Sequence, residues 1–201
     1  MGRLRLHFLR IPIDVCADNA LASARGACLG AVLHRTAVSL PKLYLETTIP
    51  SYLTAWPSGN AVIAGHQQTT REWWATCHER FALHVSQFVL DEAGAGDPEA
   101  ARLWLEALRD VPELPATESA LALAIALLAE GAVPEKARTD AAHIAVAAVH
   151  GMDFLVTWNC RHIANAEMKP RIREVCARHG WRCPEICTPE QLMPKVEGET
   201  P

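Results

Sequence analysis

Acidic and amide side chains follow three separate β-rich runs of this sequence. Glu46 ends the run 42–45, Glu92 lies shortly after the run 81–85, and Asn159 directly follows the apolar run 154–158. In an open parallel sheet, ligands bind beyond the carboxyl ends of the strands, where loops lead into helices. We therefore expect these three side chains to lie at the same edge of a sheet.

Asp140 is a candidate for a different reason, its place in a helical pattern that covers residues 135–150. It falls on the same stripe as Ile144 and Ala147, whereas His143 and His150 fall on the more polar side. A carboxylate on an inward stripe needs a cation, several hydrogen-bond donors or a metal ion. The alternative is that Asp140 caps its helix behind Thr139 or pairs with Arg138.

Convergence of Glu46, Glu92 and Asp140 would favour binding of a divalent cation. The repulsion between two such carboxylates is about 4 kcal/mol at about 4 Å and an effective dielectric constant of about 20. Ligands that are all oxygen atoms favour Mg²⁺ or Mn²⁺ over zinc. Such an ion polarises a phosphoryl oxygen, lowers the pKa of an attacking water and stabilises the leaving oxygen. The acids therefore predict hydrolysis of a phosphate ester.

Hydroxyl groups near the acids have two interpretations. In the first, a ligand, a metal-bound water or a phosphate is bound by Thr157 and by either Thr47 or Thr48. In the second, these hydroxyl groups cap helices. Trp56 and Trp158 lie close enough to the expected site to stack on a base.

Positive charge near the candidate site is concentrated after Asn159. Arg161 and His162 follow it directly, and the acids in that stretch are Glu167 and Glu174. The further basic residues are Lys169, Arg171, Arg173, Arg178 and Arg182. This set either contacts nucleic-acid phosphates or is an ordinary solvated helix face.

Alternation of short β-rich runs with longer helical patterns predicts a three-layer α/β/α domain with a parallel sheet. We expect strands at 42–45, 81–85, 114–116, 154–158 and 183–187. Helices are expected at 49–55, 61–80, 98–110, 118–130, 135–150 and 163–179, and Asp97 should cap the third of them. The most hydrophobic stretch, 120–129, is too short to cross a bilayer and predicts a buried helix, so no membrane partner is expected.

The chain of 201 residues, half of them hydrophobic, has the length for one domain. Residues 1–40 carry five Arg and two Asp without helical or strand periodicity, which predicts a poorly ordered extension of charge +3. The domain should cover 41–194, and 195–201 should be a flexible tail. Seven irregularly spaced cysteines without a signal-peptide pattern indicate a reducing cytoplasm. Zinc at Cys160, His162, Cys183 and Cys187 is disfavoured, because no pair has the spacing of a structural zinc site.

Four motifs in this order resemble the PIN-domain family, and most closely the VapC-like toxins of toxin–antitoxin pairs. They are YLETTIPSYL at 44–53, Glu92 with Gly96 and Asp97, TDAAH at 139–143, and LVTWN at 155–159. The resemblance covers residues 41–194 and includes the ending ICTPEQL at 186–192. It implies strand order 3-2-1-4-5, a Mg²⁺ or Mn²⁺ centre, endonucleolytic cleavage of RNA, a homodimer and a small antitoxin that blocks the site.

Position by position, Glu46, Glu92, Asp140 and Asn159 take the places of the family's four acidic residues. Two positions depart from the usual pattern, since Glu46 stands where Asp is usual and Asn159 is neutral. Two alternatives to an endoribonuclease toxin stay open on this basis. One is a non-catalytic interaction module with the same fold, and the other is a small metal-dependent phosphatase.

Overall fold

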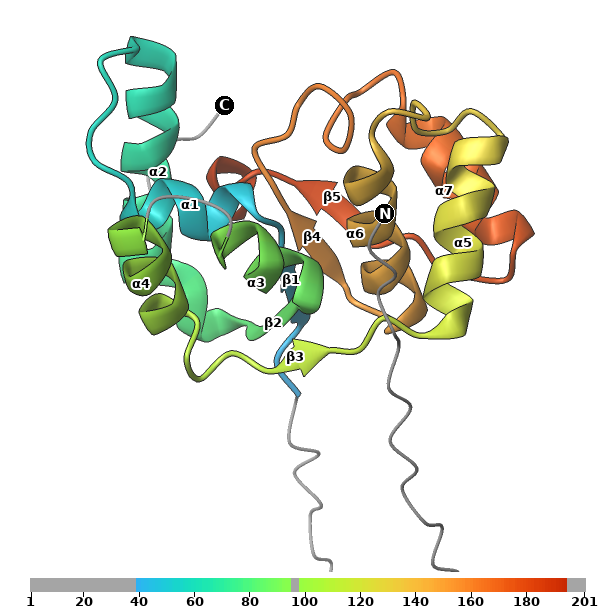
Figure 1. The fold of residues 1–201 in the computed structure, drawn as a ribbon, viewed down its shortest axis with the longest axis horizontal. Coiled ribbons are helices and arrows are strands. Elements are labelled where there is room, and N and C mark those ends of the chain that lie inside the picture. The colour runs from blue at the N-terminus through green and yellow to red at the C-terminus, as the bar shows by residue number, and fades with distance from the viewer. Residues whose placement is uncertain (1–38, 95–97, 195–201) are drawn as a thin grey trace, which may run out of the picture. The chain divides into compact units, whose positions relative to one another are not determined.

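The computed structural model of this chain describes residues 39–94 and 98–194, in which short strands alternate with helices (Figure 1). The elements in chain order are β1 Lys42–Leu45, α1 Thr48–Thr54, α2 Ala61–Cys77, η1 His78–Arg80, β2 Ala82–Ser86, α3 Gln87–Gly94, α4 Pro98–Ala107, β3 Glu113–Leu114, α5 Glu118–Ala129, α6 Arg138–Val149, β4 Phe154–Val156, α7 Lys169–Arg178, β5 Glu185–Cys187 and η2 Pro189–Leu192. The expectations for residues 1–38, for the 195–201 tail and for the cap at Asp97 lie outside the described residues.

The five strands form one parallel sheet in the order β3-β2-β1-β4-β5. Tyr44 in the central strand β1 is paired with His84 of β2 and with Leu155 of β4. The predicted α/β fold class is therefore confirmed, together with the strand order that the family resemblance implies. This order brings the ends of β1 and β4, which carry Glu46 and Thr157, side by side.

Helices cover the two faces of the sheet in the way that right-handed crossovers require. The connections from β1 to β2 and from β2 to β3 run in one direction along the sheet, so α1, α2 and α4 share one face, whereas α3 contacts both α4 and α6. The connections into β4 and β5 run the other way and place α5, α6 and α7 on the opposite face (Figure 1). The core between these layers is centred on β1, where Leu43, Tyr44 and Leu45 are fully buried.

Helix α6 is buried on most of its surface. Small side chains such as Ala141, Ala145 and Ala148 let it lie close to its neighbours α5 and β4. The prediction that His143 marks a polar side of this helix is wrong, because His143 is only 1% exposed. Asp140, in the first turn, is partly exposed and faces the end of the sheet that carries Glu46.

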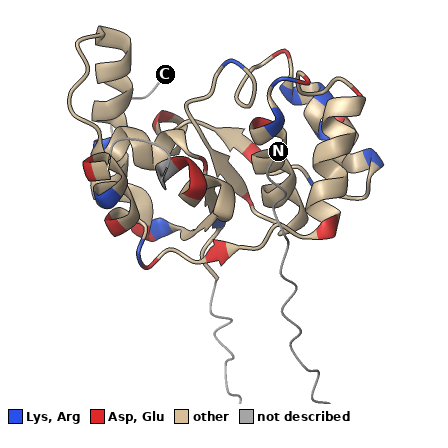
Figure 2. Ribbon diagram, viewed as in Figure 1, with Lys and Arg blue, Asp and Glu red and all other residues tan. Residues whose placement is uncertain are grey.

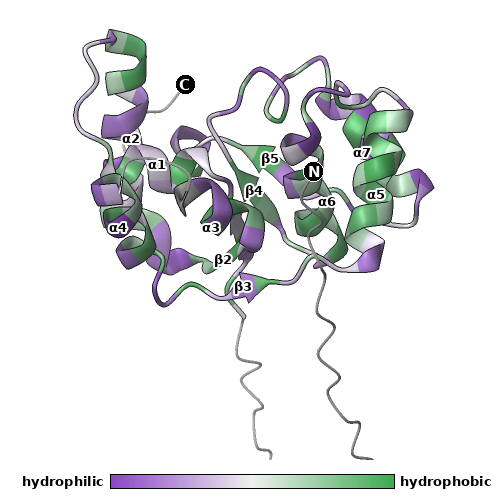
Figure 3. Cartoon of the chain, in the orientation of Figure 1, coloured by the Kyte–Doolittle hydropathy of each residue, from purple (hydrophilic) through white to green (hydrophobic). Residues whose placement is uncertain are grey.

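The prediction that residues 120–129 form a buried helix is half correct. Ala120, Leu123, Ala124 and Leu127 of α5 are buried, but Leu121 and Ile125 on the other side are 63% and 58% exposed. A helix that is hydrophobic on every side gives no periodicity from which its solvent face can be recognised. Figure 3 shows the hydrophobic character of α5 and of the central strands.

Two helices differ from the sequence prediction. Helix α7 begins at Lys169 rather than near residue 163, because Pro170 is tolerated only in the first turn of a helix. Helix α3 was not predicted, and it places Glu92 on a helix instead of in a loop. The structure contains no helix, within the described residues, that is long and apolar enough to span a membrane.

Candidate active site

Glu46 lies one residue beyond β1 and is 4% exposed. Its Oε2 atom accepts hydrogen bonds from the Thr157 hydroxyl at 2.6 Å, from the Thr48 hydroxyl at 2.6 Å and from the Thr48 backbone N–H at 3.1 Å. Burial raises the pKa of Glu46 above its usual value, although the bonds from Thr157 and Thr48 lower it, and the charge of Asp140 raises it further. The hydrogen-bond partners of Glu46 are thus neutral donors, and the nearby charge, that of Asp140, is negative like that of Glu46.

A chain of hydrogen bonds connects Glu46 to Asp140. The Thr157 hydroxyl donates to Glu46 and accepts from the Asn159 backbone N–H at 2.8 Å. The Asn159 Oδ1 accepts from the backbone N–H of His162 at 3.1 Å, and His162 Nδ1 lies 2.7 Å from Asp140 Oδ2. Five residues that the sequence singled out are therefore brought together in one network.

Asp140 does not hold Arg138 in place. Arg138 lies 3.6 Å from Glu135 instead, and the carboxylate of Asp140 is bonded to His162, with both side chains less than a fifth exposed. The alternative of an Asp140–Arg138 pair is therefore not observed. Asn159 holds the turn at the end of β4 through the His162 amide, so its side-chain oxygen already has a partner.

A second cluster of polar side chains, most of them buried, lies next to Glu92 of α3. His143 Nε2 lies 4.0 Å from Glu92 Oε2 and 3.3 Å from the Thr47 hydroxyl, while His143 Nδ1 lies 2.7 Å from the Tyr44 hydroxyl. Tyr44 in turn lies 2.6 Å from the Ser86 hydroxyl. Burial lowers the pKa of His143 to about 4, so the ring is neutral at pH 7. The pKa of Tyr44 is raised by burial, and the charges of Glu46 and Glu92 add to this.

The three acids create an excess of negative charge at this end of the sheet. Within residues 39–94 and 98–194, no Lys or Arg forms an ion pair with Glu46, Glu92 or Asp140. In the same ranges, however, no three His, Cys, Asp or Glu side chains lie close enough together to form a ready-made metal site. The donor set suits a hard divalent cation, since it consists of carboxylate and hydroxyl oxygens.

Arg161 and His162 have different surroundings. His162 is oriented by Asp140, whereas Arg161 is exposed and forms no ion pair with the described part of the chain. Arg161 is therefore the cation that adjoins the network and keeps its charge unpaired.

The rest of the predicted basic set is neutralised. Arg171 and Arg178 pair with Glu130 and Glu174. Lys169 and Arg173 pair with Glu185, and Arg182 pairs with Asp153. Glu130 and Asp153 come from other parts of the sequence, so the local count of acids missed them. The interpretation as an ordinary solvated face is the one the ion pairs support, and Figure 2 shows acidic and basic positions mixed around α7.

Trp158 is fixed beside the Glu46 network. Its backbone N–H donates to the Thr48 hydroxyl at 2.8 Å, and its indole N–H donates to the Thr70 hydroxyl at 2.8 Å. The ring stacks on His66 with centroids 4.0 Å apart, and His66 stacks more loosely on Tyr52. Trp56, in the connection between α1 and α2, is 87% exposed.

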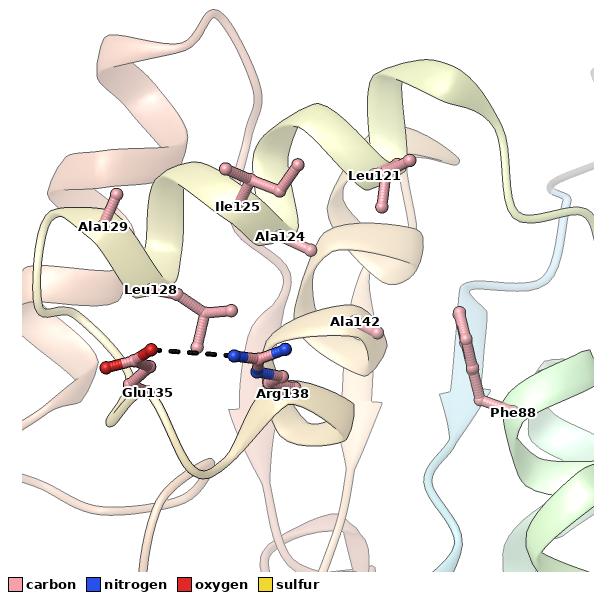
Figure 4. Close-up of a pocket in the computed structure, with 9 residues that line it drawn as sticks. All are labelled: Phe88, Leu121, Ala124, Ile125, Leu128, Ala129, Glu135, Arg138 and Ala142. Atoms are coloured by element: carbon pink, nitrogen blue, oxygen red, sulfur yellow. Dashed lines mark ion pairs between the residues drawn. The ribbon is translucent and has the colours of Figure 1, made fainter. Parts of the chain in front are cut away.

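A hydrophobic groove lies between α5, α6 and α3. Phe88, Leu121, Ile125 and Leu128 line it, and the Glu135–Arg138 ion pair lies at its rim (Figure 4). Phe88 also packs edge-on against the ring of His143, at 6.2 Å between centroids. The groove therefore adjoins the cluster of polar side chains that lies next to Glu92.

The sequence interpretation missed Tyr44, Ser86 and His143. Tyr44 precedes Glu46 by two residues, so alternation along a strand places both on one face of the sheet. His143 follows Asp140 by three residues, and helical spacing places them on neighbouring positions. These two spacings were the available signals, whereas nothing local in the sequence distinguishes Ser86.

Neither a protein-family model nor a curated protein matches this sequence. Among solved structures, the chain is similar to VapC20 of Mycobacterium tuberculosis, described as a toxin that cleaves the sarcin-ricin loop. The identity is 20%, 57% of this chain and 87% of that chain are covered, and the TM-score is 0.43.

The chain is also similar to VapBC2 of Rickettsia felis, solved with a DNA fragment from the promoter. Here the identity is 14%, the coverage is 73% of this chain and 97% of that one, and the TM-score is 0.47. Both of these similarities are at 20% sequence identity or less.

Proposed function

We propose that this protein is a metal-dependent endoribonuclease and the toxin of a toxin–antitoxin pair. The observation that carries the proposal is the buried carboxylate of Glu46. It lies at the end of the central strand, is joined to Asp140 by one hydrogen-bond network, and has neutral partners. Burial of a carboxylate without a cation is costly, and a bound cation removes that cost.

Glu46, Glu92 and Asp140 would hold Mg²⁺ or Mn²⁺ in this proposal. When bound, the ion supplies Lewis-acid polarisation of a phosphodiester and a lower pKa for the attacking water. Its affinity depends on the carboxylates being held in position by the residues around them.

The chain's own residues then have distinct tasks. Thr48 and Thr157 fix the Glu46 carboxylate, and His162 fixes that of Asp140. Arg161 is free to contact an RNA phosphate, and the exposed ring of Trp56 can stack on an unpaired base. Substrate binding through Thr47 is less direct, because its hydroxyl already faces His143.

A homodimer and a blocking antitoxin are part of the proposal, because the family resemblance implies both. Exposed Leu121 and Ile125 in the groove of Figure 4 are consistent with contact to a second protein chain.

A second candidate function is a non-catalytic interaction module that keeps the fold. Two observations favour it: the fourth acidic position is Asn159, which caps a turn, and no three ligands are assembled in the described residues. A third candidate, a small phosphatase, would use the same acids on a different substrate.

The test is a Mn²⁺ titration by calorimetry, followed by cleavage assays on single-stranded RNA and on an aryl phosphate. We expect saturable Mn²⁺ binding by the wild type, RNA cleavage that needs the metal, and loss of both in Glu46→Gln. Absence of Mn²⁺ binding would support the interaction module instead. Hydrolysis of the aryl phosphate without cleavage of RNA would support the phosphatase.

A further inference from the structure

A fully buried imidazole, His143, lies between the central strand and α3. Its Nδ1 meets the Tyr44 hydroxyl at 2.7 Å, and its Nε2 faces the Thr47 hydroxyl at 3.3 Å and the Glu92 carboxylate at 4.0 Å. A neutral imidazole carries one N–H donor and one acceptor nitrogen. The position of its single proton therefore decides what the ring offers to each side.

Two arrangements satisfy the inner contacts equally well. In the first, Ser86 donates to Tyr44, Tyr44 donates to Nδ1, and the proton is on Nε2. In the second, Nδ1–H donates to Tyr44, Tyr44 donates to Ser86, and Nε2 has a lone pair. The inner partners do not distinguish these arrangements, because both hydroxyls can donate or accept.

On the outer side the Thr47 hydroxyl can also donate or accept, so the group that distinguishes the two arrangements is the Glu92 carboxylate. An ionised carboxylate only accepts hydrogen bonds, so a lone pair on Nε2 would be repelled by Glu92, whereas an N–H there would be attracted. The first arrangement is thus the favoured one, and it makes Ser86, Tyr44 and His143 a directional chain of donors.

We propose that His143 is a positioning residue, which directs its Nε2–H toward the Glu92 carboxylate and so fixes the second acid of the site. Its role toward a metal rests on the proposed function, but the direction of the donor chain does not. Glu92 is 41% exposed on α3, and its Oε2 atom lies 4.0 Å from Nε2 of the neutral His143 ring. A neutral donor restrains this carboxylate without bringing a positive charge that would compete with a cation.

The competing explanation is a core histidine that is satisfied by Tyr44 alone. In that case the proton position on the ring is independent of Glu92, and the side chain matters only for stability. Heteronuclear NMR of the wild-type protein with ¹⁵N-labelled histidine separates the two, because the ring-nitrogen shifts identify the protonated nitrogen. We expect the Nε2–H tautomer for His143. The Nδ1–H tautomer would overturn the proposal.

Two variants test the consequence for the site. His143→Gln keeps an N–H donor near the Nε2 position, and His143→Met fills a similar volume without one. We expect His143→Met to bind Mn²⁺ about tenfold more weakly than wild type, as is typical when a residue that orients a metal ligand is lost. His143→Gln should stay within about threefold, while both variants lower the melting temperature similarly through loss of the Tyr44 contact.

Equal Mn²⁺ affinity for the two variants would refute the positioning role, since a purely structural residue gives no rescue by Gln. Failure of the proposed function has a different signature, because the wild type itself would then bind no Mn²⁺. The tautomer measurement does not depend on metal, so it decides the direction of the donor chain in either case.

Discussion

Replacing Glu46 with Gln should stabilise the metal-free protein. The amide keeps the shape of the side chain, and its oxygen can still accept from Thr157 and Thr48. Each of three hydrogen bonds loses its charge assistance, at a cost of about 1 kcal/mol each, whereas relief of the buried charge returns several kcal/mol. The net gain is on the order of 1 kcal/mol, or about 2–4 °C in melting temperature for a domain of this size.

The effect of metal should have the opposite sign. At a Mn²⁺ concentration of about 100 times the Kd, the wild type gains about 2.7 kcal/mol. That corresponds to roughly 5–10 °C in melting temperature. Glu46→Gln lacks the charge that holds the ion and should gain little. The order of stability of the two proteins should therefore reverse on addition of Mn²⁺.

The pH dependence follows from the sign of the Glu46 shift. Its pKa is raised in the folded protein from the ordinary value of 4.5, so the folded state favours the protonated form. Protonated Glu46 contributes stability that is fully present below about pH 4.5 and is lost as the pH rises through the folded pKa. Without metal, the advantage of Glu46→Gln should thus be absent at low pH, grow through this window and stay constant above it.

Thermal melts of both proteins, with EDTA and with Mn²⁺ and over a range of pH, provide the assay. Thr54→Ser is a matched control, because its hydroxyl bonds to a helix carbonyl at Pro50 and not to the acids. Destabilisation of metal-free Glu46→Gln, or an equal response of both proteins to Mn²⁺, would refute the reasoning.

Three further outcomes are expected. Asp140→Asn should abolish metal-dependent cleavage and change the free energy of unfolding by less than about 1 kcal/mol. The stability changes little because the weaker hydrogen bond to His162 and the relieved repulsion against Glu46 offset each other. Cleavage assays and thermal melts measure the two effects. Asn159→Asp should tighten Mn²⁺ binding in calorimetry by adding a ligand charge, and unchanged affinity would mean that residue 159 serves only the turn. A chain that starts at Pro41 should melt within about 2 °C of the full-length protein, and a larger drop would show that the first 40 residues contribute to the fold.

The sequence was sufficient to predict the strand positions that create the site. Glu46 and Asn159 follow apolar runs, and the rule that parallel strands present ligands at their carboxyl ends places them together. The network from Glu46 to Asp140 bears out that expectation for both residues. Assignment of these residues as metal ligands stays a prediction.

Properties that depend on distant partners could not be predicted in this way. The basic residues of α7 are neutralised by Glu130 and Asp153, which lie far away in the sequence. Similarly, His143 was assigned to a polar side because helical periodicity describes one helix and not the neighbours that bury it. Its contacts with Tyr44 and Phe88 come from two other elements.

Cleavage of a closed circular RNA tests the central claim most directly, because it excludes exonucleases and reports one internal cut. The wild-type protein with Mn²⁺ should linearise the circle, EDTA should prevent this, and Glu46→Gln should be inactive under both conditions. Attack by water should also leave no 2′,3′-cyclic phosphate on the products. Linearisation by wild type in EDTA, equal activity of Glu46→Gln, or products ending in a cyclic phosphate would contradict a metal-dependent endoribonuclease built on Glu46.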